Sequence, residues 1–310
     1  MMNPNYQKHF PVMLGEVIEI LQPKGAKVYV DATFGNGGYT EAILSRAECK
    51  VIALDRDPSV LPRAQELRQK FGHRFEFRQG CFGDFASLVP EQIDGAVFDI
   101  GVSSMQLDQA ERGFSFSKEA PLDMRMSQDG FSAADVVNTF SEEDIADILY
   151  VYGEEHKSRQ IARKIVEARA LKPLETTKEL AFAVYSVIRP WRGEAIDPAT
   201  RTFQALRIFV NDELNQLQRG LEQASLRLTP EGRLIVVDFH SLEDRIVKNF
   251  FRQNSDKHVH VSRYRTPETS TPSTALFSFA SKAVLPSFEE VEQNPRSRSA
   301  KLRYAVRNKS

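Results

Sequence analysis

Cysteine is scarce in this chain of 310 residues, which contains only Cys49 and Cys81. Because there is neither a CxxC pair nor a Cys/His cluster, the sequence indicates no disulfide framework and no zinc or iron–sulfur site, and we expect no metal. Long apolar runs are also missing, and residues 1–10 lack the basic and apolar regions of a secretory signal. We therefore expect a cytoplasmic protein without a membrane partner.

A large net charge is missing as well, since 41 Lys and Arg residues balance 42 Asp and Glu residues. The whole-chain balance gives no sign of a nucleic-acid partner, but the charges are unevenly distributed. Residues 94–155 hold fourteen acids and three Lys or Arg residues, whereas residues 241–310 hold thirteen bases and seven acids. Such asymmetry indicates either a local basic face or ordinary solvated faces.

Short β-branched segments alternate with helical patterns in the N-terminal third of the chain. The predicted strands are Val28–Asp31, Val51–Asp55, Phe75–Arg78 and Gly95–Ile100, with a later one at Gly232–Phe239. The helices predicted between them are Tyr39–Ser45 and Pro58–Phe71. This alternation predicts an α/β fold with a parallel, Rossmann-like sheet and right-handed crossovers.

The middle of the chain has a different pattern. Residues 113–196 have the 3.6-residue periodicity of amphipathic helices and no segment typical of a buried parallel strand. We therefore expect a helical domain at 113–196 inserted into a sheet domain formed by 1–112 and 197–310. The Ser/Thr/Pro-rich stretch at 266–274 is expected to be a loop.

A helix start signal follows the insertion, with Asp197 as the N-cap and Pro198 at the first helical position. We expect one helix over 197–228, with an apolar stripe from Phe203 to Leu221 that faces the core. The opposite stripe faces a polar cleft, the inserted domain or solvent, and carries Thr200, Gln204, Arg207 and Asn211.

The stretch YVDATFGNGGYTEAIL, residues 29–44, leads from a strand through three glycines into a helix. Such a loop favours a small ligand, because glycine allows positive φ and close backbone approach. The P-loop pattern is excluded because no Lys-Ser/Thr pair follows Gly38. A dinucleotide fingerprint is weakened, since its third glycine is missing.

Acids at the predicted strand ends favour S-adenosylmethionine as the cofactor. Asp55 lies where an acid can bind a ribose diol, and Asp99 lies at the mouth of the cleft. The cofactor has no phosphates but carries an ammonium, a carboxylate and a sulfonium. We expect Asp31 to bind the ammonium, and the N–H groups of the loop, with Gly35 forming its turn, to bind the carboxylate.

Nine motifs in order, from His9 to about Arg303, resemble the bacterial ribosomal RNA small subunit methyltransferase H family. They are HFPVMLGEVIEIL, DATFGNGGYT, ALDRDP, FDIGVSSMQLD, RGFSF, PLDMRM, ATRTFQALRIFVNDEL, PEGRLIVVDFHSLEDRIVKNFF and NPRSRSAKLR. The resemblance implies transfer of a methyl group from S-adenosylmethionine to N4 of a cytidine in the decoding region of 16S rRNA. It also implies a Rossmann-like methyltransferase domain interrupted by a helical, substrate-recognising one.

The resemblance also implies a set of cofactor contacts. They fall on Gly37, Gly38, Tyr39, Asp55, Phe82, Asp99 and Gln106. An aromatic ring such as Phe82 can cover the adenine, although a core position is the alternative. Many members of the family have histidine where this chain has Tyr39, so the contact at that position is left open.

Methylation of a cytosine amino group calls for acceptors that hold its hydrogens. We expect Asp99 and the backbone carbonyls of residues 100–102, which include Gly101, to provide them. His240 and Glu243 follow a strand and either shape the cytosine pocket or cap the next helix. A Ser/His/Asp triad is not expected, because neighbours on one turn cannot align as a triad.

Aromatic and basic residues are the predicted RNA contacts. Phe114 or Phe116 would form a stacking platform, or both anchor the inserted domain. Asp123 and Arg125 form a substrate clamp or a structural ion pair. Phosphate contacts are expected from two basic segments, which contain Lys157, Arg159, Arg163, Lys164 and Arg169, and Arg296, Arg298, Lys301 and Arg303. Arg207 on the long helix is a further candidate substrate contact.

The partner implied is 16S rRNA in the small ribosomal subunit, and the sequence leaves open whether the chain forms a homodimer. Two alternatives remain: a small-molecule methyltransferase whose insertion serves as a lid, and a non-catalytic ribosome-assembly factor that binds S-adenosylmethionine. An NAD oxidoreductase ranks last.

Overall fold

The computed structural model describes residues 11–190, 197–255 and 275–309. The N-terminal stretch 1–10, the predicted loop 266–274 and the predicted domain boundary at residue 196 lie outside these residues. The chain divides into two compact units: the first comprises Met1–Gly101 and Leu214–Ser310, and the second comprises Val102–Glu213. Among the described residues, no helix combines the length and the apolar character needed to cross a membrane.

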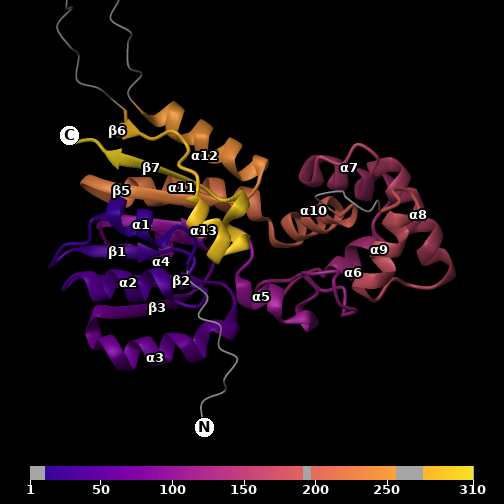
Figure 1. Cartoon of the computed structure of the whole chain (residues 1–310), viewed down its shortest axis with the longest axis horizontal. Helices are drawn as coiled ribbons and strands as arrows, with labels where there is room; N and C mark the ends of the chain where they lie inside the picture. Colours follow the sequence, from indigo (N-terminus) through magenta and orange to yellow (C-terminus); the bar gives the residue numbers. More distant parts are fainter. Residues whose placement is uncertain (1–10, 191–196, 256–274, 310) are drawn as a thin grey trace, which may run out of the picture. The chain divides into compact units, whose positions relative to one another are not determined.

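The first unit is built on a seven-stranded sheet with the order β3-β2-β1-β4-β5-β7-β6 (Figure 1). Its strands are β1 (Val28–Asp31), β2 (Lys50–Asp55), β3 (Phe75–Gln79), β4 (Ile93–Asp99), β5 (Leu228–Asp238), β6 (Phe277–Ala280) and β7 (Lys301–Arg307). The strands β1 to β5 pair in parallel, whereas β7 pairs antiparallel with β5 and β6. The predicted α/β class and parallel Rossmann-like sheet are confirmed.

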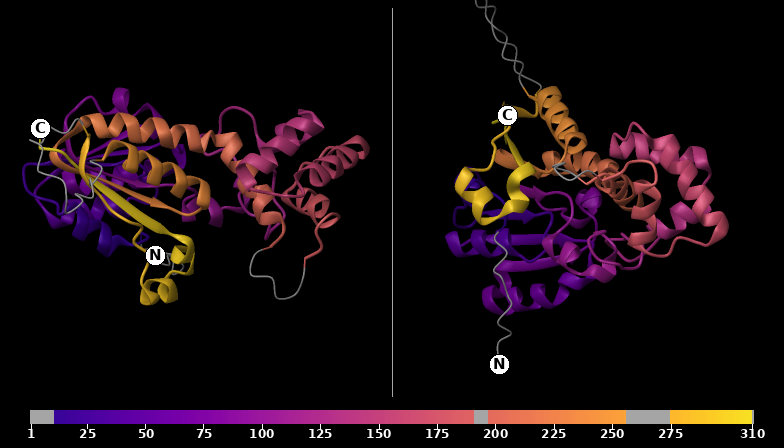
Figure 2. Two further views of the ribbon diagram at one scale, coloured as in Figure 1. Left: turned by 90° about the horizontal axis from the view of Figure 1, so that it is seen from above. Right: turned by 45° about the vertical axis from the view of Figure 1, so that its right-hand side comes forward.

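Helices cover both faces of this sheet, which explains why its central strands are apolar throughout. One face carries residues of α1, α2 and α3, such as Val17, Ile43 and Leu67. The other face carries Leu217 of α11 and Phe251 of α12, and Figure 2 shows these two helices in orange. The helices of this unit are α1 (Leu14–Leu21), α2 (Gly38–Arg46), α3 (Leu61–Phe71), α4 (Phe85–Leu88), α11 (Glu213–Arg227), α12 (Ser241–Asn254) and α13 (Phe288–Gln293).

The second unit is helical and has a core of its own. Its helices are α5 (Ser104–Asp108), α6 (Ala133–Thr139), α7 (Glu142–Gly153), α8 (Ser158–Leu171), α9 (Thr177–Tyr185) and α10 (Ala199–Asn211). Capping boxes begin α5, α6 and α9, where the side chains of Ser103, Ser132 and Thr176 accept hydrogen bonds from backbone N–H groups. This unit is wider than the predicted insertion 113–196, because it also includes α5 and α10.

The long helix predicted over 197–228 is in fact two helices, so this prediction was wrong. The chain breaks at Asp212, which has a left-handed φ of 51°. Phe203 and Leu206 of α10 are buried in the core of the second unit, whereas Leu217 and Leu221 of α11 are buried in the first. A single apolar stripe in the sequence therefore serves two separate cores.

Candidate functional site

The carboxyl ends of β1 and β4 define the topological switch point of the sheet. The neighbouring pairs are β1 with β2 on one side and β1 with β4 on the other, so the chain leaves these strand ends in opposite directions. Ligands of open parallel sheets bind at such a point. The glycine loop, Asp31 and Asp99 all lie there, as the sequence predicts.

Two backbone N–H groups of the glycine loop already form hydrogen bonds within the protein. The N–H of Gly35 donates to Asp55 Oδ2 at 2.8 Å, and the N–H of Gly37 donates to the Phe34 carbonyl at 2.7 Å. A Cβ at Gly37 would lie 2.7 Å from Leu67, and one at Gly38 would lie 2.1 Å from Pro11. Both glycines are thus required by the packing of the protein itself, and two N–H groups expected for a ligand carboxylate are engaged within the protein.

Asp31 and Asp55 are held by their own surroundings. Asp31 is fully buried, and its Oδ2 accepts hydrogen bonds from the hydroxyl of Thr40 at 2.7 Å and from its N–H at 3.2 Å. Asp55 accepts from the N–H groups of Gly35 and Asp57. Burial raises the pKa of each carboxyl to about 6. Each carboxyl is therefore harder to ionise than an exposed aspartate, and a bound cation would favour its charged form.

Asp99 differs from these two acids, because one of its oxygens is buried without a partner. Oδ1 has no hydrogen-bond partner among the described residues. Burial, together with the charges of Asp31, Glu243 and Glu290, raises the pKa of Asp99 to about 8, although the Tyr39 hydroxyl opposes this shift. An unsatisfied buried acceptor of this kind is costly unless a ligand donates to it.

The fit to S-adenosylmethionine follows from this electrostatics. The charge of Asp31 raises the pKa of both Asp55 and Asp99, so the three acids act on one another. Negative groups concentrated at the switch point favour a ligand that carries an ammonium and a sulfonium over one that carries a pyrophosphate.

Tyr39 is buried and contributes to the scaffold. Its side chain is 3% exposed, and its hydroxyl donates a short hydrogen bond to the Val12 carbonyl. Burial raises the pKa of Tyr39 well above its usual range. The ring therefore braces the start of α2 against the segment before α1.

Phe82 lies in the loop after β3, in the 3-10 turn η3 (Phe82–Asp84). Its ring is half-buried and packs edge-on against Phe98, with 5.6 Å between the ring centroids. A Cβ at Gly220 of α11 would lie 2.9 Å from this ring. Phe82 thus packs against Phe98 of β4 and against α11, and the residue as a whole remains partly exposed.

A glutamine of α11 fastens the same loop. The Gln223 amide donates to the Gly83 carbonyl at 3.0 Å and accepts from the Ala86 N–H at 2.7 Å. The sequence analysis missed this residue, because two residues about 140 positions apart show no local pattern.

His240 and Glu243 cap α12 at the carboxyl end of β5. His240 Nδ1 accepts from the Glu243 N–H at 3.4 Å, and Glu243 Oε2 accepts from the N–H of Phe239 at 2.9 Å. The structure therefore shows the capping role that the sequence analysis gave as one of two alternatives. His240 Nε2 lies 3.1 Å from Glu243 Oε1.

Gly101 brings this cap beside the end of β4. It has a φ of 101°, which favours glycine, and a Cβ there would lie 3.9 Å from Glu243 Oε1. The predicted catalytic residues Asp99, Gly101 and His240 therefore belong to one strand-end cluster, joined by Glu243.

Gln106, Phe114 and Phe116 lie in the second unit. The side-chain oxygen of Gln106 accepts from the Ser103 N–H at 3.0 Å in a capping box. Phe114 is 8% exposed and belongs to the core of this unit, and Phe116 packs edge-on against Phe203 at 4.9 Å. For Phe114 the structure corrects the stacking hypothesis, since a ring without an exposed face cannot stack on a base, and it favours the anchoring alternative.

Two predicted substrate arginines form ion pairs within the second unit. Arg125 Nε and Nη2 donate to the two oxygens of Asp123 at 2.9 and 2.7 Å. Although burial opposes it, Arg125 holds the pKa of Asp123 below its usual range. Arg207 donates in the same bidentate manner to Glu213 at 2.8 and 2.9 Å, with both side chains largely buried. The pair of Asp123 and Arg125 matches the structural alternative predicted for it, and the pairing of Arg207 with Glu213 was not predicted.

The predicted phosphate contacts separate into two groups. Lys301 and Arg303 pair with Asp244 at 3.1 and 2.7 Å, and Arg169 donates to the Val137 carbonyl; their heads are therefore engaged within the protein. The exposed members are Lys157, Arg159, Arg163, Lys164, Arg296 and Arg298. Two of them pair with exposed acids, Arg163 with Glu142 at 3.5 Å and Lys164 with Glu167 at 2.6 Å.

Glu290 of α13 is a further residue that the sequence analysis missed. Its carboxylate accepts from the Met13 N–H at 2.7 Å, and its charge contributes to the raised pKa of Asp99. The run FEEVEQ is typical of a solvated helix face, so no sequence signal distinguished it. Among the described residues, no group of three or more His, Cys, Asp or Glu side chains could hold a metal ion.

Comparison with known proteins gives a match over nearly the whole chain. The profile of the MraW methylase family matches residues 6–308. The chain is 52% identical to the ribosomal RNA small subunit methyltransferase H of Rickettsia akari over 301 residues, which covers 96% of this chain and 98% of that protein. It is 53% identical to the protein of the same name from Rhodospirillum rubrum, with 96% and 94% covered. Among solved structures, an rRNA methylase from Streptococcus thermophilus aligns with a TM-score of 0.42 at 12% identity and covers 95% of this chain and 93% of that one.

Proposed function

The chain belongs to the MraW methylase family, and from this premise we propose that it methylates the N4 amino group of a cytidine in the decoding region of 16S rRNA. The methyl donor is S-adenosylmethionine. The observation that carries the proposal is the match of about half of all residues to rRNA small subunit methyltransferases along the full chain. The cluster of Asp31, Asp55 and Asp99 at the switch point supports a donor with cationic groups.

The first unit holds the donor in this proposal. Asp55 binds the ribose, the exposed part of Phe82 covers the adenine, and Asp31 faces the ammonium. When bound, S-adenosylmethionine supplies an electrophilic methyl group together with its own leaving group. The work left to the protein is therefore to orient the amino nitrogen of the cytosine and to manage its protons.

Asp99 is the acceptor that we assign to the amino group. Its buried Oδ1 has no partner in the described part of the chain, and a carboxylate there stabilises the positive charge that develops on the nitrogen. One amino proton leaves as the new N–C bond forms and the bond from sulfur to methyl breaks, and in this proposal Asp99 takes the proton. The backbone carbonyls at residues 100–102 accept the second amino hydrogen, while Glu243 and His240 support the wall beside Gly101.

The second unit recognises the substrate in this proposal. Its exposed Lys157, Arg159, Arg163 and Lys164 bind phosphates and position the RNA without reading its bases. The partner is 16S rRNA within the small ribosomal subunit, which places the protein in the cytoplasm.

We expect the purified protein to methylate small ribosomal subunits from cells that lack it, and not free cytidine. Mass analysis of rRNA nucleosides should show one additional N4-methylated cytidine after incubation with S-adenosylmethionine. Methylation of free nucleosides at a comparable rate would instead indicate a small-molecule methyltransferase. Donor binding without any turnover on subunits would indicate an assembly factor.

Replacing Gln223 by alanine is expected to weaken binding of S-adenosylmethionine about 5- to 30-fold, because it removes two hydrogen bonds that fasten the Phe82 loop, each worth about 1 kcal/mol. Titration calorimetry measures the change, and kcat at saturating donor should stay near its original value.

The matched control is Arg219→Ala on the same helix. Arg219 also touches this loop, through an ion pair with Asp84 in which both side chains are about half exposed. Exposed pairs of this kind contribute little. If both variants weaken the binding of S-adenosylmethionine equally, Gln223 does not position the loop.

A further inference from the structure

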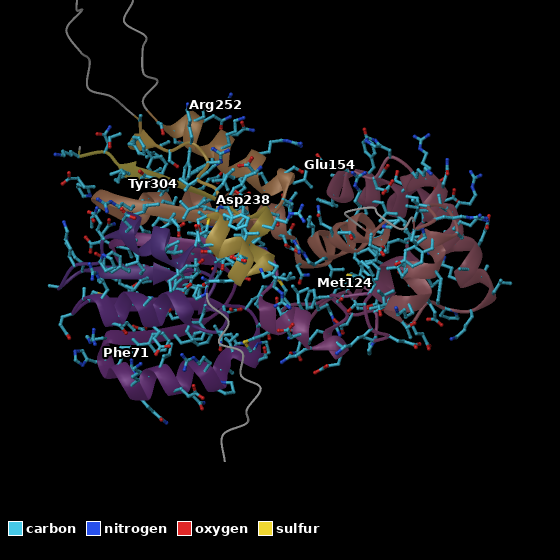
Figure 3. All side chains as sticks on the ribbon, viewed as in Figure 1. Phe71, Met124, Glu154, Asp238, Arg252 and Tyr304 are labelled. Carbon is cyan, nitrogen blue, oxygen red and sulfur yellow. The ribbon has the colours of Figure 1, made fainter. Side chains whose placement is uncertain are left out.

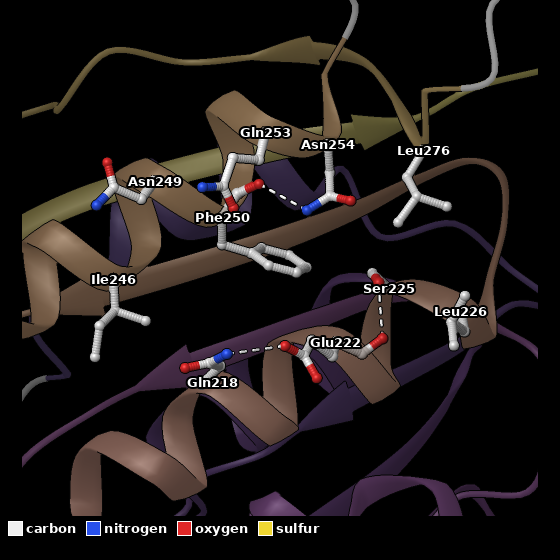
Figure 4. A pocket seen from close by; sticks show the side chains of 10 residues that line it. All are labelled: Gln218, Glu222, Ser225, Leu226, Ile246, Asn249, Phe250, Gln253, Asn254 and Leu276. Carbon is white, nitrogen blue, oxygen red and sulfur yellow. Dashed lines mark hydrogen bonds between the residues drawn. The ribbon is translucent and has the colours of Figure 1, made fainter.

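Helices α11 and α12 border a pocket that the proposed chemistry does not use (Figure 4). Its volume is about 510 Å³. Leu226 of α11, Ile246 and Phe250 of α12, and Leu276 form its apolar part. Figure 4 shows the ring of Phe250 directed into the space between the two helices. Leu226 is 63% exposed, so the apolar surface is open to a ligand.

Side-chain amides surround this apolar surface. They belong to Gln218, Asn249, Gln253 and Asn254. An amide group offers both donors and an acceptor, which matches the edge of a nucleobase. Gln218 donates to Glu222 Oε1 at 3.1 Å and Asn254 donates to the Phe250 carbonyl at 2.9 Å. These contacts fix the orientation of two of the amides. The oxygen of a third, Asn249 Oδ1, accepts from Arg252 Nη2 at 3.3 Å.

The charge beside the pocket is positive. Arg245, Lys248 and Arg252 occupy one exposed face of α12 at a spacing of three and four residues, and Arg252 is labelled in Figure 3. From β7, Arg307 donates to the carbonyl of Ser225, a residue of the lining, at 3.4 Å. Glu222 is the acid in the lining. This charge complements a phosphate backbone better than it complements a protein surface of average composition.

The pocket is separate from the strand-end cluster. His240 is the N-cap of α12, and the lining residues of its second half, Asn249 to Asn254, lie about 14 to 21 Å further along the helix axis at 1.5 Å per residue. A ligand here cannot be the cytidine beside Asp99.

We propose that this pocket is a second RNA site, which takes one unpaired nucleotide of the rRNA substrate; the inference rests on the proposed function. The base lies against Phe250 and Leu226, its edge meets the amides, and Lys248 and Arg252 bind the flanking phosphates. Single-stranded RNA sites combine these three elements: an aromatic surface, polar groups at the base edge and a basic border. The site adds affinity for the subunit without contributing to methyl transfer.

The test uses the full chain with two sets of variants and a control. In the first, Lys248→Glu with Arg252→Glu, we expect the KM for unmethylated small subunits to rise about tenfold or more. The salt dependence of binding to protein-free 16S rRNA should also decrease, by about 1.4 in its log–log slope, because two phosphate contacts are lost. Affinity for S-adenosylmethionine and kcat at saturating subunit should not change.

The second variant, Gln253→Ala, should raise the same KM severalfold while leaving the salt slope intact, because this amide meets the base and not the phosphate. The control is Lys24→Glu, an exposed lysine after α1, which should change neither quantity.

Three outcomes would overturn the proposal. An unchanged KM and slope in the charge variant means that no RNA binds here. Loss of binding to subunits but not to protein-free rRNA means that a protein occupies the pocket. A cross-link from a probe at position 253 to another part of this chain, and not to RNA, means that the chain covers it. The salt slope is measured without turnover, so a failure of methyl transfer would refute the proposed function separately.

Discussion

Replacing Asp99 by asparagine is expected to lower kcat for RNA methylation about 10²- to 10³-fold, the usual effect of removing one preorganised group that stabilises developing charge. Asparagine keeps the size of the side chain, so the cleft should retain its shape. It cannot accept a proton or provide a negative charge. S-adenosylmethionine should still bind, since Asp31 and Asp55 are unaltered.

The pH dependence makes this prediction specific. Only the ionised carboxylate of Asp99 can take a proton and provide a negative charge, and its pKa is about 8. We therefore expect kcat/KM of the original protein to rise about tenfold per pH unit below pH 8 and to level off above it, because kcat/KM reports ionisation of the free enzyme. A bound cation favours the carboxylate, so the rise in kcat should occur at lower pH.

The asparagine variant should lose this rise, and Asp94→Asn serves as the matched control. Asp94 lies on the same strand at its amino end, where its carboxylate pairs with Lys27 at 2.8 Å. That variant should keep both kcat and the pH profile. A variant at position 99 that retains kcat within about twofold and the same pH profile would show that Asp99 is not the acceptor.

The second large effect concerns stability and Asp238, the last residue of β5, which is labelled in Figure 3. Its side chain is fully buried, and neither of its oxygens has a hydrogen-bond partner among the residues that the structure describes. Burial and the charges of Asp244 and Glu243 raise its pKa to about 8, against the opposing effect of Lys301 and Arg303. The folded protein therefore keeps a proton on Asp238 that the unfolded chain releases near pH 3.8.

This difference decides the sign of the pH effect. Between pH 3.8 and about pH 8 the folded state binds more protons at this site than the unfolded state, so stability falls as the pH rises. Each pH unit lowers the free energy of unfolding by about 1.4 kcal/mol, which gives about 3 kcal/mol between pH 6 and pH 8. Above pH 8 the loss stops, because the carboxyl ionises in both states.

Asp238→Asn should remove this contribution. Urea unfolding at pH 6 and pH 9 measures it: the loss of unfolding free energy should be smaller in the variant by about 3 kcal/mol. Asp99, whose pKa is also raised to about 8, contributes to the same fall in stability with rising pH, and this contribution remains in Asp238→Asn. Asp99→Asn should remove it, which provides an internal comparison. An identical pH dependence in Asp238→Asn and the original protein would mean that Asp238 is ionised in the fold at neutral pH.

Much of the site was predictable because it depends on local patterns. The strands ending at Asp31, Asp55 and Asp99 are short, apolar and bounded by glycine or charged residues, and a parallel sheet brings their carboxyl ends to one edge. The family, too, was predicted correctly from nine short motifs. The cap formed by His240 and Glu243 follows from their spacing of three residues at a helix start.

Other features could not be predicted, because they depend on contacts between distant parts of the chain. The break at Asp212 is invisible to periodicity, since one apolar stripe continues across it into a second core. Gln223, Glu290 and the internal pairing of Arg303 acquire their roles from partners that lie far away in sequence. Phe114 carries an aromatic ring of the kind that stacks on bases, yet it is buried in the core of the second unit.

The amino-acid sequence by itself therefore determined the α/β class, the sheet edge at which the candidate site residues gather, and the family, since these follow from periodicity and from residues close together in the chain. Only the tertiary structure decided which acids are satisfied, which bases are already paired, and which buried carboxyls hold their protons to about pH 8. The physical reason is that desolvation and hydrogen bonding are properties of the packed surroundings, which residues far apart in sequence create together.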